Sequence, residues 1–139
     1  MARPEKIRLG ELLVQQKLIS QDQLKFALEQ QKRSGRKLGR VLVDNAFVTE
    51  EHISEALAKQ LQIPYINLKR YNINLELVRL LPELQARRFR AIVLEERNQI
   101  LLGGMADPTD LAAFDEISRI LKREIDVAVV TEGQLLESI

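Results

Sequence analysis

The chain has 139 residues, of which 45% are hydrophobic and 29% are charged, a composition typical of a folded globular protein and not of a disordered one. Its 21 basic and 20 acidic residues nearly cancel, which argues against a generally nucleic-acid-binding protein, and the absence of cysteine excludes disulfides and thiolate metal sites. No apolar run approaches the roughly 20 residues that a bilayer span requires, so we expect a soluble, unexported, cytoplasmic protein without membrane insertion.

The positive charge is unevenly distributed along the chain. Residues 1–63 contain eleven Lys and Arg residues against eight Asp and Glu residues, whereas residues 64–139 contain ten against twelve. Five cations in the first part stand close together around two glycines in the stretch KRSGRKLGR, residues 32–40. Such a local excess fits either an anionic partner or a solvated cationic face, even in a nearly neutral chain.

The first part of the chain is built from two copies of one unit. The stretch RLGELLVQQKLISQDQLKFALEQQ, residues 8–31, aligns without a gap on KLGRVLVDNAFVTEEHISEALAKQ, residues 37–60, at a constant offset of 29. Identical residues occupy seven pairs of positions: Leu9 and Leu38, Gly10 and Gly39, Leu13 and Leu42, Val14 and Val43, Ala27 and Ala56, Leu28 and Leu57, and Gln31 and Gln60. This self-similarity indicates a duplicated structural unit.

Each copy has the pattern of a helical hairpin. In the first copy, apolar residues at three- and four-residue spacing predict a helix over Leu9–Gln16, and Ser20 is the predicted N-cap of a second helix, in a capping box. The second copy predicts the same plan, with a helix from Leu38, a break near Asn45–Phe47, and Thr49 as the N-cap of the following helix.

From residue 64 onward, strands and helices are mixed. The predicted elements are, in chain order, a strand at Tyr65–Leu68, a helix at Pro82–Arg88, a β-hairpin at Ala91–Ala106 that turns near Arg97–Gln99, a helix at Thr109–Lys122, and a strand at Asp126–Thr131. Asp107, before Pro108, is expected to help cap the later helix. The last stretch, EGQLLESI, has the pattern of a helix start, so we expect the chain to be a fragment of a longer protein.

The expected fold class is therefore α+β. An all-helical tandem hairpin repeat over residues 1–63 precedes a small α+β subdomain over residues 64–139, with the boundary near Gln62–Tyr65.

A cation, a leucine and a glycine recur at the start of each copy. A helix N-terminus offers unpaired N–H groups and the positive end of the helix dipole to an anion, and glycine lets a ligand approach the backbone. Gln31 and Gln60, which end the apolar stripes, can both donate to and accept from the edge of a base. The pattern fits a dinucleotide ligand, whereas duplication for packing alone would account for the leucines and alanines.

The repeat resembles the tandem 24-residue motif of the MshE N-terminal domain family, found at the front of type II secretion and type IV pilus assembly ATPases. The five-residue spacer of that family corresponds here to residues 32–36, KRSGR. The stretch ADPTDLAAFDEI, residues 106–117, is similar to a later segment of the same domains, so the resemblance extends over nearly the whole chain.

What the resemblance implies is binding of the bacterial second messenger cyclic di-GMP, with no metal and no further cofactor. The contact residues carried over from the motif are Arg8, Leu9, Gly10, Leu24, Leu28 and Gln31 in the first copy, and Lys37, Leu38, Gly39, Ile53, Leu57 and Gln60 in the second. Further candidates are Lys6, Arg36, Arg40 and Asp107.

The second copy departs from the family pattern more than the first. Lys37 stands where arginine is common, which keeps the charge but loses the planar fork, and Ile53 replaces leucine. Lys17 and Ala46 occupy a turn position where glycine is frequent. These departures concern affinity, most of all at the second copy, and not architecture.

The resemblance also implies a setting for the domain. A downstream ATPase domain, a homo-hexameric full-length protein, and partner proteins of the secretion or pilus platform at the inner membrane are expected. An alternative is a docking module that links the ATPase to this platform without binding a nucleotide, through residues 87–94, RRFRAIVL, although we expect Arg87, Arg88 and Arg90 to be a solvated cationic edge.

An enzymatic function within these residues has little support. The sequence contains no GxxxxGK[S/T] phosphate loop, and its one histidine, His52, is expected on a helix surface. Asp107, Asp110 and Asp115 are not expected to form a metal cluster, because helix capping and first-turn acids explain Asp107 and Asp110. Nonspecific nucleic-acid binding through residues 32–40 lacks the interleaved aromatic residues that stack bases.

Overall fold

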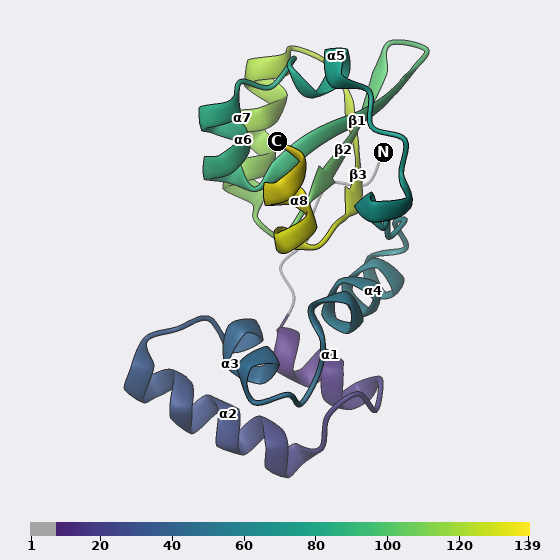
Figure 1. The fold of residues 1–139 in the computed structure, drawn as a ribbon. Helices are drawn as coiled ribbons and strands as arrows, with labels where there is room; N and C mark the ends of the chain where they lie inside the picture. The colour runs from purple at the N-terminus through teal and green to yellow at the C-terminus, as the bar shows by residue number, and fades with distance from the viewer. Residues whose placement is uncertain (1–7) are drawn as a thin grey trace. The chain divides into compact units, whose positions relative to one another are not determined.

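The computed structural model describes residues 8–139, which form two compact units (Figure 1). A helical unit covers residues 8–56 and an α+β unit covers residues 57–139. The division falls inside helix α4 (Glu50–Leu61), whereas the boundary expected from the sequence falls just after this helix.

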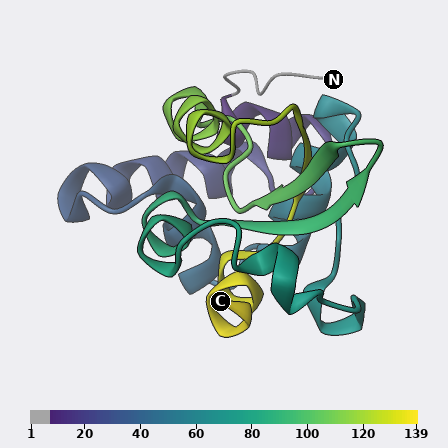
Figure 2. The ribbon, with the colours of Figure 1, turned by 90° about the horizontal axis from the view of Figure 1, so that it is seen from above.

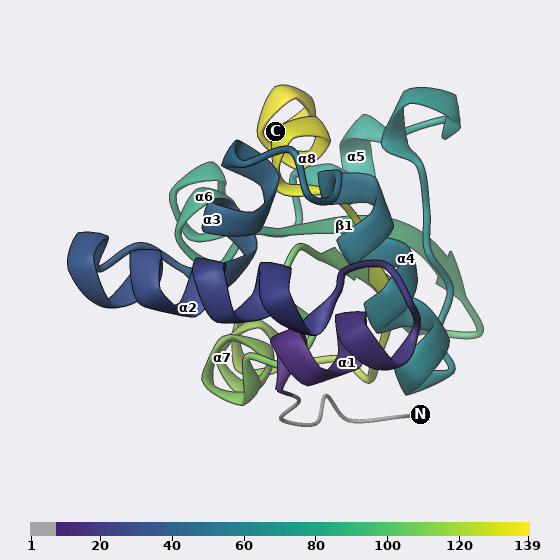
Figure 3. The ribbon, with the colours of Figure 1, turned by 90° about the horizontal axis from the view of Figure 1, so that it is seen from below.

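The helical unit contains α1 (Leu9–Gln15), α2 (Gln21–Ser34), α3 (Leu38–Asp44) and the first part of α4. Helices α1, α2 and α3 are mutual neighbours (Figure 3). Buried apolar side chains repeat at the offset of the two copies: Leu12 and Val41, Leu13 and Leu42, Ile19 and Val48, and Ala27 and Ala56. The predicted pair of helical hairpins is therefore confirmed, and these four positions are buried in both copies, whereas Leu28 is 40% exposed and its equivalent Leu57 is 8% exposed.

The second helix of each hairpin begins at a side-chain cap, as predicted. The Ser20 hydroxyl accepts from the Gln23 N–H at 3.1 Å, and the Gln23 side chain accepts from the Ser20 N–H at 2.9 Å. In the second copy the Thr49 hydroxyl accepts from the His52 N–H at 3.0 Å, and Nδ1 of the exposed His52 accepts from the Thr49 N–H at 3.4 Å. These reciprocal bonds satisfy N–H groups that the first helical turn leaves unpaired.

The turn inside each hairpin is also repeated. The N–H that ends the turn donates to a carbonyl five residues earlier, from Leu18 to Leu13 at 2.9 Å and from Phe47 to Leu42 at 3.0 Å. Lys17 and Ala46, which precede these donors, both adopt a left-handed backbone, with φ of 62° and 59°. This conformation explains why glycine is expected at the position, since only glycine adopts it without a β-carbon clash.

The α+β unit continues after α4 with eight further elements. These are η1 (Leu68–Arg70), α5 (Leu75–Val78), α6 (Glu83–Phe89), β1 (Ala91–Arg97), β2 (Ile100–Met105), α7 (Leu111–Leu121), β3 (Ile125–Val129) and α8 (Glu132–Ser138). The sheet order is β1-β2-β3, with β1 and β2 antiparallel and β2 and β3 parallel. The predicted hairpin is confirmed, and α7 is the crossover that a parallel pair requires.

Helices cover both faces of this sheet (Figure 2). On one face, Ala91 and Val93 of β1 pack in a core with Phe114 and Ile117 of α7. The alternate β1 residues, Ile92 and Leu94, pack on the other face with Leu135 of α8 and Leu68 of η1. Because side chains alternate along a strand, the unbroken apolar run of β1 is the expected consequence of burial on two sides.

Three local predictions for this unit need correction. Tyr65–Leu68 is not a strand: Tyr65 forms one isolated bridge to Val129, and the Asn67 side chain accepts from the Lys69 N–H at 3.0 Å to start the 3₁₀ turn. Strand β3 ends at Val129, because Thr131 is already the N-cap of α8. Asparagine and threonine favour such turn and cap positions over strand interiors.

The third correction concerns the cap of α7. Asp110, and not Asp107, is the N-cap, and its carboxylate accepts from the Ala113 N–H at 3.0 Å. Asp107 instead accepts from the N–H of Thr109 at 3.0 Å, in a turn before the helix. In residues 8–139, every helix is too short or too polar to cross a membrane.

Candidate functional site

The predicted ligand residues occupy equivalent places in the two copies. Arg8 and Lys37 are the N-cap residues of α1 and α3, and each is followed by the Leu-Gly pair of the first helical turn. The other six residues lie on the second helix of each hairpin, with Leu24, Leu28 and Gln31 on α2, and Ile53, Leu57 and Gln60 on α4. Since side chains three and four residues apart share a helix face, each triplet forms one stripe.

The two glycines bring the copies together within the helical unit. A β-carbon built on Gly10 would lie 2.5 Å from Leu24 Cδ1 and 3.2 Å from Leu38 Cδ2. A β-carbon built on Gly39 would lie 3.7 Å from Ile53 Cδ1 and 3.4 Å from Leu9 Cδ2. Each glycine thus faces the apolar helix residue of its own copy and the leading leucine of the other copy, so six of the predicted residues form one cluster with exchanged neighbours.

The stripe on α2 combines buried, exposed and polar surface. Leu24 is 8% exposed, whereas Leu28, one turn later, is 40% exposed, and Gln31 is half-buried. An apolar side chain at the surface next to an amide is the combination that nucleotide pockets use, with apolar contact for the base and a polar group for its edge. On α4, the division between the units separates Leu57 and Gln60 from Ile53.

The leading cations differ in their surroundings. The Arg8 side chain is 84% exposed, and its Nη1 lies 3.4 Å from Oε1 of Glu11. In the second copy the equivalent residues are Lys37 and Arg40, which are both exposed. Glu11 is not among the residues predicted from the sequence, although its position three residues after Arg8 in a helix is a signal that would have found it.

The first turns of α1 and α3 have no side-chain hydrogen bond at their N-caps, in contrast with the first turns of α2 and α4. Arg8 and Lys37 stand at these N-caps in extended backbone conformations. Neither arginine nor lysine can accept a hydrogen bond, so the cap residues themselves leave these N–H groups to another acceptor.

The additional candidates lie elsewhere. Lys6 falls outside the described residues. Arg36 forms an ion pair with Asp44 at the end of α3, and Arg40 lies on the first turns of that helix. Asp107 belongs to the α+β unit, where it stabilises the turn before α7.

No group of three or more His, Asp or Glu side chains in residues 8–139 is arranged to hold a metal ion. Asp107 and Asp110 have structural roles in the turn and the cap of α7, as described above.

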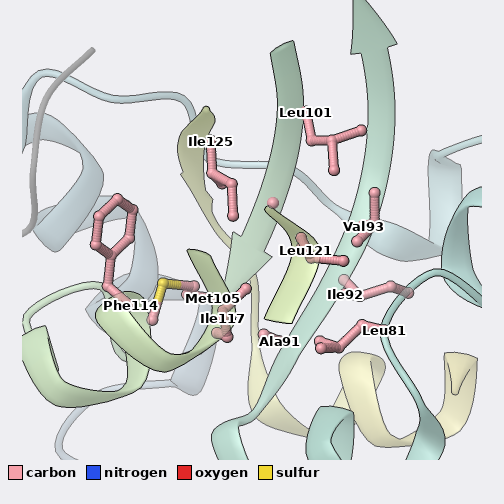
Figure 4. Close-up of a pocket in the computed structure, with 11 residues that line it drawn as sticks. Leu81, Ala91, Ile92, Val93, Leu101, Met105, Phe114, Ile117, Leu121 and Ile125 are labelled. Carbon is pink, nitrogen blue, oxygen red and sulfur yellow. The ribbon is translucent and has the colours of Figure 1, made fainter. Parts of the chain in front are cut away.

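An apolar cavity of about 10 Å³ lies between α7 and the sheet of the α+β unit (Figure 4). Phe114 and Ile117 of α7, with Leu101 and Met105 of β2, are among the residues that line it. A space of this size is at the lower limit for one water molecule, and its apolar lining offers water no partner. It is a packing defect and not a ligand site.

Tyr71 of the α+β unit has a perturbed hydroxyl. Burial raises the pKa of this group above its ordinary value of 10.0, and the nearby Glu95 carboxylate raises it further. The hydroxyl donates to the Leu94 carbonyl at 3.4 Å. The phenol is neutral at physiological pH with or without this shift, so the shift does not point to a catalytic role for Tyr71.

A family profile of the MshEN domain matches residues 61–139, more than half of the chain. The chain belongs to the MshEN domain family. The matched residues cover the α+β unit, and the tandem repeat precedes them. Membership confirms the family resemblance seen in the sequence.

Curated relatives of this MshEN domain are much longer proteins. It is 32% identical over 132 residues to the type IV pilus assembly ATPase PilB of Myxococcus xanthus, covering 95% of this chain and 23% of PilB. PilB of Thermus thermophilus is 32% identical over 131 residues, covering 93% and 15%. Bacteriophage adsorption protein B of Escherichia coli is 24% identical over 128 residues, covering 92% and 17%. The chain thus spans less than a quarter of the length of these relatives.

Solved structures confirm the α+β fold class. A structure of MshE with cdg, cyclic di-GMP, matches with a TM-score of 0.84 and 37% sequence identity, covering 96% of each chain. The N-terminal domain of XpsE matches with a TM-score of 0.75 and 20% identity, covering 94% of this chain and 90% of that chain. The XpsE likeness concerns the fold alone.

Proposed function

We propose that this MshEN domain binds cyclic di-GMP through its tandem repeat and is a regulatory domain of a type IV pilus or type II secretion assembly ATPase. The observation that carries the proposal is the exchanged packing of the two copies around Gly10 and Gly39. Cyclic di-GMP has two equivalent halves, each with one phosphate and one guanine. A duplicated cluster with reciprocal neighbours would offer the same backbone arrangement to both halves.

The similarity to MshE supports the same ligand. The two chains share 37% identity across 96% of each, and MshE was solved with cyclic di-GMP. In this chain, Arg8 and Lys37 would supply charged donors to the two halves of the ligand, and Leu24 and Leu28 the apolar contact for a base. Gly39, whose position is more open than that of Gly10, would let the ligand approach the start of α3 without a side chain between them.

Further parts of the proposal concern the longer protein. The PilB and MshE likenesses support an ATPase domain elsewhere in it, and a homo-hexamer next to the inner-membrane platform of the pilus or secretion machine is part of the same proposal. Ligand binding to the repeat would then change the output of that ATPase. The domain itself would carry no catalytic residue.

A docking function through residues 87–94 is the weaker candidate. Residues Ala91–Leu94 form the buried first part of strand β1, with exposed fractions of 1–2%. Arg87 and Arg90 form ion pairs with Glu83 and Glu132, and the Arg88 guanidinium lies 5.3 Å from the centre of the Phe89 ring. These contacts favour the expected solvated cationic edge over a protein-docking surface.

Calorimetric titration of the 139-residue chain with cyclic di-GMP tests the proposal. We expect saturable binding near one ligand per chain, which Arg8→Ala weakens at least about tenfold because a charge-assisted bond to the ligand is lost. Arg119→Ala is the matched control, since Arg119 is also exposed and also pairs with a glutamate three residues away, on α7. GTP should not bind at the same concentrations.

Absence of heat and of a thermal shift at high cyclic di-GMP concentration would contradict the proposal. Equal losses in Arg8→Ala and Arg119→Ala would show that general charge, and not the repeat, holds the ligand.

A further inference from the structure

The two copies are equivalent in backbone but not in side-chain chemistry. The first copy has Arg8 at the N-cap of α1 and Glu11 in the first turn of that helix, with 3.4 Å between Arg8 Nη1 and Glu11 Oε1. The second copy has Lys37 and Arg40 at the same positions. The first copy therefore presents a planar donor fork beside a carboxylate acceptor, whereas the second presents donors at both positions.

An arginine guanidinium beside a carboxylate, as in the Arg8–Glu11 pair, favours guanine over adenine. Guanine offers two adjacent acceptors, O6 and N7, to the fork, and its ring N–H and 2-amino group are donors that a carboxylate accepts. Adenine has a 6-amino donor in place of O6, which would face the guanidinium donors of Arg8. The first copy should therefore discriminate strongly against adenine.

A lysine in the same place makes a weaker distinction. The Lys37 ammonium is a compact point charge on a flexible stem, so one acceptor satisfies it. N7 is an acceptor in both purines. The residue at the Glu11 position, Arg40, carries no acceptor that would favour the donors of guanine. Replacing guanine by adenine therefore costs less binding affinity at the second copy than at the first.

We propose that this chain also binds a mixed cyclic dinucleotide, with one guanine and one adenine, in a single orientation. The guanine lies against the first copy, at Arg8 and Glu11, and the adenine lies against the second copy, at Lys37. This inference rests on the proposed function, because it uses the same site. It changes the ligand class from cyclic di-GMP alone to cyclic dinucleotides with at least one guanine.

Competition titrations of the chain with cyclic di-GMP, the mixed guanine-adenine cyclic dinucleotide and cyclic di-AMP test the inference. The mixed ligand should bind within about threefold of cyclic di-GMP, and cyclic di-AMP should bind roughly 5- to 150-fold more weakly, the range of one lost two-point base contact. Lys37→Arg should move the mixed ligand into that weaker range and leave cyclic di-GMP unchanged or tighter.

The reciprocal variant converts the first copy into a second one. In the double variant Arg8→Lys with Glu11→Arg, the gap between cyclic di-AMP and cyclic di-GMP should close to within about threefold. Both substituted side chains, Arg8 and Glu11, are exposed, so the melting temperature should stay close to that of the parent chain.

Three results would overturn the inference while leaving the proposed function intact: cyclic di-GMP binds but the mixed ligand binds as weakly as cyclic di-AMP, Lys37→Arg leaves the preference unchanged, or the parent chain binds cyclic di-AMP as well as cyclic di-GMP. Failure of all three ligands to bind would remove the proposed function and the inference together.

Discussion

Lys17 and Ala46 occupy a turn position of the repeat where glycine would be favoured. Both hold a left-handed backbone, with φ of 62° and 59°, at the turn that joins the helices of each hairpin. A β-carbon in this region costs about 1–2 kcal/mol relative to right-handed backbone. By contrast Gly35, which ends α2 with φ of 71°, adopts the conformation without that cost. Glycine at Lys17 or Ala46 should therefore raise the free energy of unfolding.

Ala46→Gly should raise the free energy of unfolding by about 0.5–1 kcal/mol, because relief of the strain exceeds the larger chain entropy that glycine loses on folding. Gly35→Ala is the opposite control and should lower it by about 1 kcal/mol, although a β-carbon there meets no atom within 4 Å. Urea denaturation of the three chains measures both changes. A destabilised Ala46→Gly variant would show that residual strain at this turn is small.

Packing of α1 and α3 differs between the two copies at the scale of whole helices. The Gly10 position is closed by the buried Leu24, whose Cδ1 would lie 2.5 Å from a new β-carbon. The equivalent position at Gly39 is more open, with its nearest atoms at 3.4 Å and 3.7 Å, which are ordinary contact distances. The same substitution should therefore have different effects in the two helices.

Gly10→Ala should lower the free energy of unfolding by about 1–3 kcal/mol, because Leu24 has to leave a packed position. Gly39→Ala should change it by less than about 1 kcal/mol, yet weaken cyclic di-GMP binding at least about tenfold, because the new methyl group occupies the path of the ligand to the helix start. Thermal denaturation and calorimetric titration separate the two effects. A Gly39→Ala variant with unchanged affinity would place the ligand away from this helix start.

At the scale of the whole molecule, the charge is balanced and the cations are local. The chain has 21 basic and 20 acidic residues, yet residues 32–40 contain five cations and no acid. A cluster of this kind can attract any polyanion, whereas a site for a dinucleotide neutralises two phosphates and also contacts bases. The salt dependence of binding distinguishes these two modes, because it grows with the number of phosphates neutralised.

Raising the salt concentration from 50 to 200 mM should weaken cyclic di-GMP binding by less than about tenfold, since only two phosphates are involved. A single-stranded oligonucleotide that binds through many phosphate contacts would lose roughly 10³-fold or more over the same interval. Fluorescence titrations with both ligands at four salt concentrations give the two slopes. A steep slope for cyclic di-GMP would favour nonspecific attraction by the cationic stretch.

The helices of the repeat follow from local rules, which is why the sequence alone predicts them. Ser20 and Thr49 cap helices through bonds to residues three positions away, and the apolar spacing of each stripe is visible in one helix. Prediction from local patterns was wrong where one stretch of sequence fits two local structures. Asp107 and Asp110 are both plausible caps, and Tyr65–Leu68 has an apolar pattern that the Asn67 turn overrides.

The sequence by itself thus determined the duplication and the residues of each motif, because they appear as self-similarity at a constant offset of 29, and it determined the hairpins and the α+β fold class, because helix and strand patterns depend on neighbours within a few positions. Only the tertiary structure decided that Gly10 faces Leu38 and Gly39 faces Leu9. It also separated the buried Leu24 from the exposed Leu28. These features arise from packing between helices that are distant along the chain, and no local propensity specifies which faces meet.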